Sequence, residues 1–119
     1  MPFEITPSLV PVLTARLFAE HDRAEASAML AEHAANAKHP EIVRVQVAAL
    51  KLSDGAIDKL RQAIANANID YRDVLAWAEY PAQMRGPVTG LSKGQTNSLV
   101  AADHVQYEAW LRAHVDDAT

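Results

Sequence analysis

The stretch PEIVRVQVAALKL, residues 40–52, decides the fold class of this chain. On a helix, its apolar residues would cover most of the circumference, with polar interruptions only at Arg44, Gln46 and Lys51. The valines would also suit a strand, but the proline start, the length and the Ala-Ala-Leu centre favour a helix. A helix that is apolar on several sides is typical of the centre of a bundle. We therefore expect Ile42–Leu52 to be the central helix, in contact with several others.

Capping and turn residues indicate two helices before this stretch. Thr6 can cap a first helix, with Pro7 at its first position. Asp22 and Glu25 resemble a capping box for a second helix that runs to about Asn36. The sequence AKHP then separates this second helix from the central one.

Two further helices are expected directly after the central stretch. Ser53 or Asp54 can cap the fourth helix of the chain, after the turn sequence SDG. Asp70 can cap a fifth helix that runs to Tyr80. Pro81 is expected to end that helix, because the residue before a proline is pushed out of the helical region.

The last helix is predicted to begin with the capping box Ser92-x-x-Gln95 and to run to about His114. No long run of the chain alternates apolar and polar residues, so strands are not expected. We therefore expect one all-α domain over residues 1–119, a compact bundle of five or six short helices. The alternative is a short α-solenoid-like helical stack over residues 24–80, although no repeat of fixed period supports it.

The composition narrows the class of function. Eleven lysines and arginines face fifteen aspartates and glutamates, for a formal net charge of −4. Nucleic-acid binding normally requires a basic patch, so this balance disfavours it. The absence of cysteine excludes disulfides and Cys-based zinc sites. No apolar run approaches the ~20 residues of a membrane span, and a signal-peptide pattern is missing. We expect a cytoplasmic protein without nucleic-acid or membrane partners.

The candidate chemistry is sparse. His104 and Glu108 are four residues apart, on one face of the last predicted helix, but two ligands do not make a metal site. The serines lack the surroundings of a nucleophile, and no phosphate-binding loop is present. We therefore expect no catalytic residues, no cofactor and no metal. A pocket between residues 70–80 and 92–114 remains as a hypothesis for a small enzyme or ligand binder, with candidates Asp73, His104, Tyr107 and Glu108.

The segment NIDYRDVLAWAEYP, residues 68–81, concentrates aromatic and charged side chains. One face of this predicted helix is a core stripe: Tyr71, Val74, Leu75 and Ala78. The side chains that this stripe leaves over are a candidate interaction surface, since aromatic residues and arginine dominate binding hot spots. These are Arg72, Trp77, Glu79 and Tyr80. The first hypothesis is thus a non-catalytic module that binds a protein partner or a second copy of itself.

VQVAALKLSDGAIDKLRQAI followed by DYRDVLAWAEYP resembles a family of small bacterial all-helical proteins of unknown activity. The resemblance covers roughly residues 43–81 and rests on an LS-x-G turn, a KL helix and a YRDVLAWAEYP-like segment. It implies a bacterial, helical protein and carries over no functional residue. Ala56 departs from the acidic residue expected after the turn glycine, which weakens the expected cap of the fourth helix.

Overall fold

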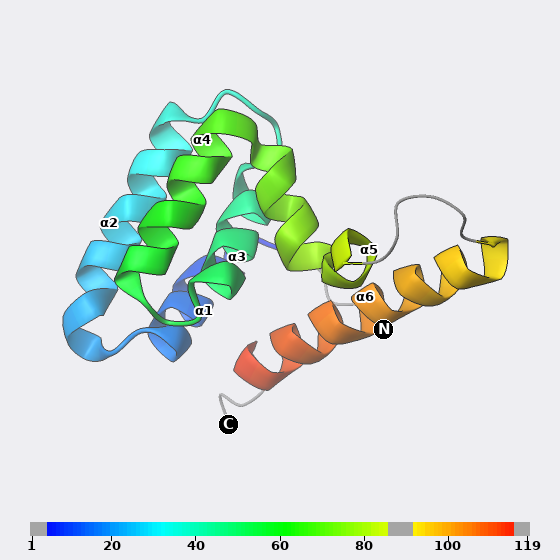
Figure 1. Ribbon diagram of the computed structural model, residues 1–119. Coiled ribbons are helices and arrows are strands. Elements are labelled where there is room, and N and C mark those ends of the chain that lie inside the picture. Colours follow the sequence, from blue (N-terminus) through cyan, green and yellow to red (C-terminus); the bar gives the residue numbers. More distant parts are fainter. Residues whose placement is uncertain (1–4, 86–91, 116–119) are drawn as a thin grey trace.

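The computed structural model describes residues 5–85 and 92–115, and this part of the chain is all-α (Figure 1). The bundle predicted from the sequence is confirmed, although two of its helices are long, with 23 residues each. The six helices are α1 (Leu9–Leu17), α2 (Glu20–Asn36), α3 (Ile42–Ser53), α4 (Ile57–Glu79), α5 (Pro81–Arg85) and α6 (Lys93–Val115). None of them is long and apolar enough to cross a membrane.

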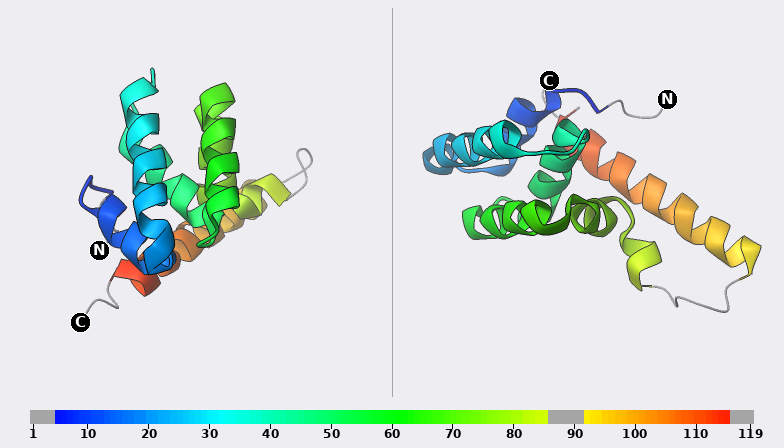
Figure 2. Two further views of the ribbon diagram at one scale, coloured as in Figure 1. Left: turned by 90° about the vertical axis from the view of Figure 1, so that its left-hand side faces the viewer. Right: turned by 90° about the horizontal axis from the view of Figure 1, so that it is seen from above.

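Helix α3 is the centre of the bundle, as its sequence predicts. Every residue from 45 to 50 is buried, and α3 packs against α1, α2 and α4. Figure 2 shows α2 and α4 running beside each other with α3 close to both, while α6 crosses the end of the bundle. The apolar circumference of α3 explains this position, because a helix without a polar face must be covered on several sides.

The three polar interruptions of α3 each reach another helix. The Gln46 side chain donates to the carbonyl of Leu30 in α2 at 3.0 Å. The Lys51 ammonium donates to the carbonyl of Ala78 in α4 at 2.7 Å. Arg44 bonds the end of α4, as described below. Buried polar groups are expected to find such partners, since an unpaired one costs about 1–3 kcal/mol.

The fourth and fifth helices of the sequence prediction form one kinked element, α4. Asp70 has φ −154° and ψ 105°, which is extended backbone inside the helix. Its carboxylate accepts a hydrogen bond from the Arg72 backbone N–H at 3.0 Å and binds the Arg72 guanidinium at 2.9 Å. Asp70 therefore caps the second half of α4, as predicted, but without a loop before it.

The predicted cap of the fourth helix is wrong. Ser53 is the last residue of α3, and its hydroxyl donates to the carbonyl of Leu50 at 2.6 Å. Asp54 and Gly55 follow with φ of 49° and 80°, and α4 begins only at Ile57. Ser53 and Asp54 thus end one helix instead of starting the next, because left-handed residues satisfy the last carbonyls of a helix.

Both predicted starts at the N-terminal end also shift. Helix α1 begins at Leu9, after Ser8, so Pro7 is not its first residue. Helix α2 begins at Glu20 after the extended Ala19, and Asp22 already lies in its first turn. The predicted Asp22–Glu25 capping box is therefore wrong, since the connection between α1 and α2 is shorter than expected.

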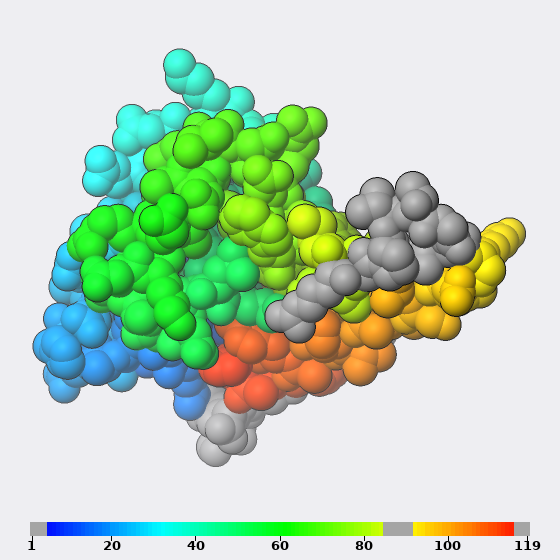
Figure 3. Space-filling model, in the orientation of Figure 1, coloured from blue at the N-terminus to red at the C-terminus, as the bar shows by residue number. Residues whose placement is uncertain are grey.

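The last helix begins as predicted. The Ser92 backbone N–H donates to the Gln95 side chain at 2.9 Å, and the Gln95 N–H donates to the Ser92 hydroxyl at 3.1 Å. These reciprocal bonds are a capping box. In the space-filling view, the first turns of α6 project beyond the bundle, and residues 93–98 are exposed (Figure 3). The second half of α6 packs on α1 and α4 and forms one wall of a cavity.

Candidate functional site

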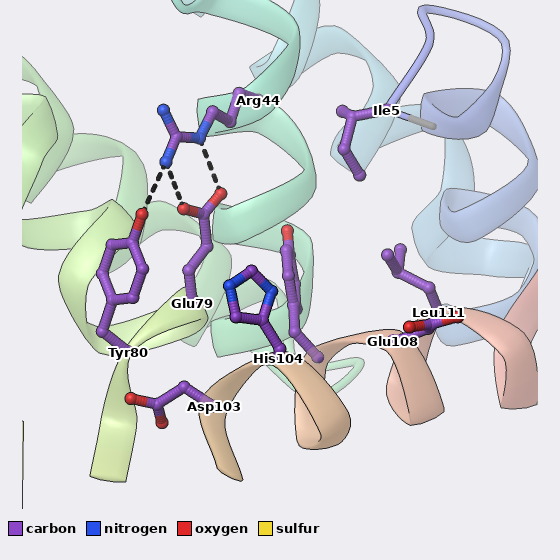
Figure 4. Close-up of a pocket in the computed structure, with 9 residues that line it drawn as sticks. Ile5, Arg44, Glu79, Tyr80, Asp103, His104, Glu108 and Leu111 are labelled. Carbon is purple, nitrogen blue, oxygen red and sulfur yellow. Dashed lines mark hydrogen bonds and ion pairs between the residues drawn. The ribbon is translucent and has the colours of Figure 1, made fainter. Parts of the chain in front are cut away.

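A cavity of about 230 Å³ lies between α3, the end of α4 and α6 (Figure 4). A space of this size is larger than the ~150 Å³ cavity that holds benzene in an engineered protein. Apolar and ionisable side chains share its lining, and they come from four separate parts of the chain. The lining residues are Ile5, Arg44, Glu79, Tyr80, Asp103, His104, Tyr107, Glu108 and Leu111.

One wall is an ordered network of Arg44, Glu79 and Tyr80. The Arg44 guanidinium donates two hydrogen bonds to the buried Glu79 carboxylate, one of them at 2.8 Å from Nε to Oε2. Its Nη2 also donates to the Tyr80 hydroxyl at 2.9 Å. The bond to Glu79 raises the pKa of Arg44, so the guanidinium stays charged. Because a bidentate pair holds both partners in one geometry, this wall is preorganised.

Asp103 forms the wall on the α5 side. Its carboxylate accepts hydrogen bonds from the backbone N–H groups of Ala82 and Gln83, at 2.7 and 3.2 Å. The Gln83 side chain adds a third bond at 2.9 Å. Asp103 is buried, and these three donors hold the start of α5 against α6. These hydrogen bonds of the carboxylate are therefore made within the fold.

Tyr107 supplies a polar atom without a partner. Its hydroxyl oxygen is buried and makes no hydrogen bond to any residue that the structure describes. Two contacts hold the ring in place. It stacks on Trp110 with 6.1 Å between the ring centroids, and the Lys51 ammonium lies over it, 5.7 Å from the ring centroid. Burial raises the pKa of Tyr107 well above its ordinary value, so the phenol keeps its proton. The lining of the cavity thus includes a fixed donor that has no partner among residues 5–85 and 92–115.

His104 and Glu108 lie at the rim, on α6. Figure 4 shows the His104 ring on the α6 side of the cavity, below the Arg44–Glu79 pair. Glu108 accepts hydrogen bonds from Arg112 at 2.8 and 3.2 Å, and this contact lowers the pKa of Glu108. Among residues 5–85 and 92–115, no group of three or more His, Asp or Glu side chains is placed to hold a metal ion.

The structure brings three of the four predicted pocket residues together. His104, Tyr107 and Glu108 all line the cavity. Asp73 does not line it, and its side chain is exposed. The reason is the position of Asp73 along α4, two helical turns, or roughly 10 Å, before Tyr80.

The predicted interaction surface is divided among different parts of the molecule. Glu79 and Tyr80 belong to the cavity wall. Arg72 is exposed and bonded to Asp70 at the kink of α4. Trp77 is 42 % exposed and lies on another face, where it lines two shallow grooves. These four residues therefore do not form one patch.

Sequence reasoning missed Arg44 and Asp103 as cavity residues. The signal for Arg44 was its place as a charged interruption in an otherwise apolar helix, because such a residue needs a partner on a neighbouring element. Asp103 carried no comparable signal, since its partners are the backbone N–H groups of α5.

Comparison with known proteins adds no assignment. A scan against models of protein families, a search of curated proteins and a search of solved structures each found no match. The resemblance of residues 43–81 to a bacterial helical family therefore stays a prediction.

Proposed function

We propose that this protein binds a small organic molecule in the cavity between α3, α4 and α6, without transforming it. The observation that carries the proposal is the buried hydroxyl of Tyr107, which has no partner among the described residues and lies beside the ordered Arg44–Glu79–Tyr80 wall. Buried polar atoms in native proteins nearly always have a partner, and an exception calls for a reason. A ligand that binds this hydroxyl supplies that reason.

The side chains at the cavity favour binding over catalysis. Nucleophilic catalysis needs an activated nucleophile with a base beside it. Among the described residues that line the cavity, there is no serine, threonine or lysine. The raised pKa of Tyr107 makes its phenolate a rare species, and Arg44 holds the Glu79 carboxylate in an ion pair. These groups recognise a molecule better than they attack one.

Blocking the cavity tests this proposal. His104 is exposed at the rim, so His104→Trp places a bulky ring over the cavity with little effect on the core. Val105→Trp is the matched control, because Val105 is 69 % exposed on the same helix and does not line the cavity. We expect small cyclic molecules to shift the backbone NMR signals around Tyr107 in the wild type and in Val105→Trp, but not in His104→Trp. Equal shifts in all three proteins would overturn the proposal.

A second candidate function is protein binding through Trp77. This side chain is 42 % exposed and, together with Leu52, lines both shallow grooves on its face of the molecule. One groove extends to Trp110 on α6. Half-exposed tryptophans are frequent anchors of interfaces, because they bury a large area with few rotatable bonds. A second copy of the chain is the simplest partner for this surface.

Sedimentation equilibrium distinguishes this second candidate. We expect the wild type to associate in a concentration-dependent manner, and Trp77→Ala to weaken this association. Ile69→Ala is the control, since Ile69 is 84 % exposed on the same helix and outside both grooves. A wild type that stays monomeric, or a Trp77→Ala variant that associates like Ile69→Ala, would remove the support for self-association.

A further inference from the structure

We propose that the molecule bound in this cavity is uncharged and accepts a hydrogen bond from Tyr107 through an amide or hydroxyl oxygen. The inference rests on the proposed function and names its ligand class. Three features of the lining carry it: the pairing of its charges, the hydroxyl donors that remain, and the apolar side chains between them.

The charges at the cavity are already paired within the protein. Three carboxylates and one guanidinium line it. Arg44 binds Glu79, the α5 backbone and Gln83 bind Asp103, and Arg112 binds Glu108. An anionic ligand would meet more carboxylates than guanidinium groups, and a cationic ligand would have to compete with existing donors for each carboxylate. Because each of these charged groups already has a partner, both kinds of ligand are disfavoured relative to a neutral one.

Two phenol groups remain to recognise a neutral ligand. The Tyr107 hydroxyl has no partner in the part of the chain that the structure describes, and its raised pKa keeps the proton in place. The Tyr80 hydroxyl accepts a hydrogen bond from Arg44, which leaves its own proton to be donated elsewhere. Both groups are therefore donors, and a carbonyl or hydroxyl oxygen is the natural acceptor for them.

The remaining lining fits an apolar body. Leu111 is 2 % exposed and lines the cavity together with Ile5. The volume of about 230 Å³ admits a single six-membered ring, since ~150 Å³ is enough for benzene. The ligand class is thus a compact, mostly apolar molecule with one neutral polar group.

Three probes of nearly equal shape separate charge from size: cyclohexanecarboxamide, cyclohexanecarboxylate and cyclohexylmethylammonium. Each is titrated into the full chain at about pH 8, where both charged probes keep their charge, and binding is followed by backbone NMR shifts around Tyr107. We expect the carboxamide to bind roughly tenfold more tightly than either charged probe.

Substitution of the donor completes the test. Tyr107→Phe removes only the hydroxyl, and we expect it to weaken carboxamide binding roughly tenfold. Tyr71→Phe is the matched control, because Tyr71 lies outside the cavity, where it stacks on His39. The same substitution there should leave binding unchanged.

The outcomes separate the two proposals. If no probe binds, ligand binding in the cavity fails and this inference fails with it. If a charged probe binds as tightly as the carboxamide, or if Tyr107→Phe binds the carboxamide like the wild type, only the ligand class is overturned. Carboxamide selectivity that is lost in Tyr107→Phe and kept in Tyr71→Phe supports both.

Discussion

Arg44 and Glu79 form a bidentate ion pair that fastens the first turn of α3 to the last residue of α4. The two residues are 35 positions apart in the chain, and Glu79 is buried. The pair is both a tie between two helices and a wall of the cavity. The first effect expected from removing the pair is therefore a loss of stability, ahead of any change in ligand binding.

We predict that Arg44→Met lowers the free energy of unfolding by about 2 kcal/mol, because it leaves a buried carboxylate without its partner. The value is below that for a fully buried pair, since the Arg44 side chain is 36 % exposed. Urea denaturation measures it. The double variant Arg44→Met/Glu79→Leu should recover at least half of the loss, and a double variant as unstable as the sum of its parts would contradict this.

Tyr107→Phe should increase the free energy of unfolding by about 1 kcal/mol. The substitution keeps the ring contacts with Trp110 and removes a buried hydroxyl that has no partner in the described part of the chain. Thermal and urea unfolding test it against Tyr71→Phe as the control. A destabilised Tyr107→Phe protein would show that the hydroxyl has a partner within the fold.

Asp103→Ala should lower the free energy of unfolding by about 2 kcal/mol, because two backbone N–H groups at the start of α5 lose a charged acceptor. Backbone NMR should show the largest shifts at Ala82 and Gln83. Asp73→Ala is the control, since Asp73 is exposed and should change stability by less than about 0.5 kcal/mol. Equal effects at both positions would contradict the role given to Asp103.

Gly55→Ala should be strongly destabilising, by about 2 kcal/mol or more, because Gly55 has φ 80° and an added Cβ would lie 2.5 Å from the Leu17 carbonyl oxygen. Gly94→Ala is the matched control. Its Cβ would lie 3.9 Å from the Ser92 hydroxyl, an ordinary contact, in the first turn of α6, so a gain of up to about 0.5 kcal/mol is expected. Melting temperatures that fall equally in both variants would contradict the assignment.

His33 should make stability depend on pH. Burial, with a smaller effect of His39, lowers the pKa of His33 in the folded state, so the unfolded chain binds the proton more tightly. The contribution of neutral His33 to the free energy of unfolding is fully present above the ordinary histidine pKa of about 6.5. It is lost as the pH falls towards the lowered pKa of the folded state.

Urea unfolding at about pH 8 and about pH 5.5 measures this dependence. His33→Gln should reduce the drop in stability between the two pH values. His21→Gln should keep it, since the His21 side chain is 80 % exposed. A drop that is unchanged in His33→Gln would assign the pH dependence to other groups.

Local patterns in the sequence were enough to predict the all-α bundle and the central place of residues 42–52. Hydrophobic periodicity is a pattern over a few residues, and a helix that is apolar on several sides must pack at the centre of a bundle to bury them. The capping box of Ser92 and Gln95 was predictable for the same reason, because both partners lie within one turn. The Asp22–Glu25 box was not, since the start of α2 depends on how the chain leaves α1.

The cavity was decided by the tertiary structure. Helical periodicity could place His104, Tyr107 and Glu108 together, because they share one helix. It could not show that they line a cavity with Arg44 and Glu79. That shared lining depends on how α6 lies across α3 and α4. Chain entropy and side-chain packing over the whole bundle determine that arrangement, and neither can be evaluated from residue spacing within one helix. The sequence by itself therefore determined the helices, and their packing determined which polar groups face one another.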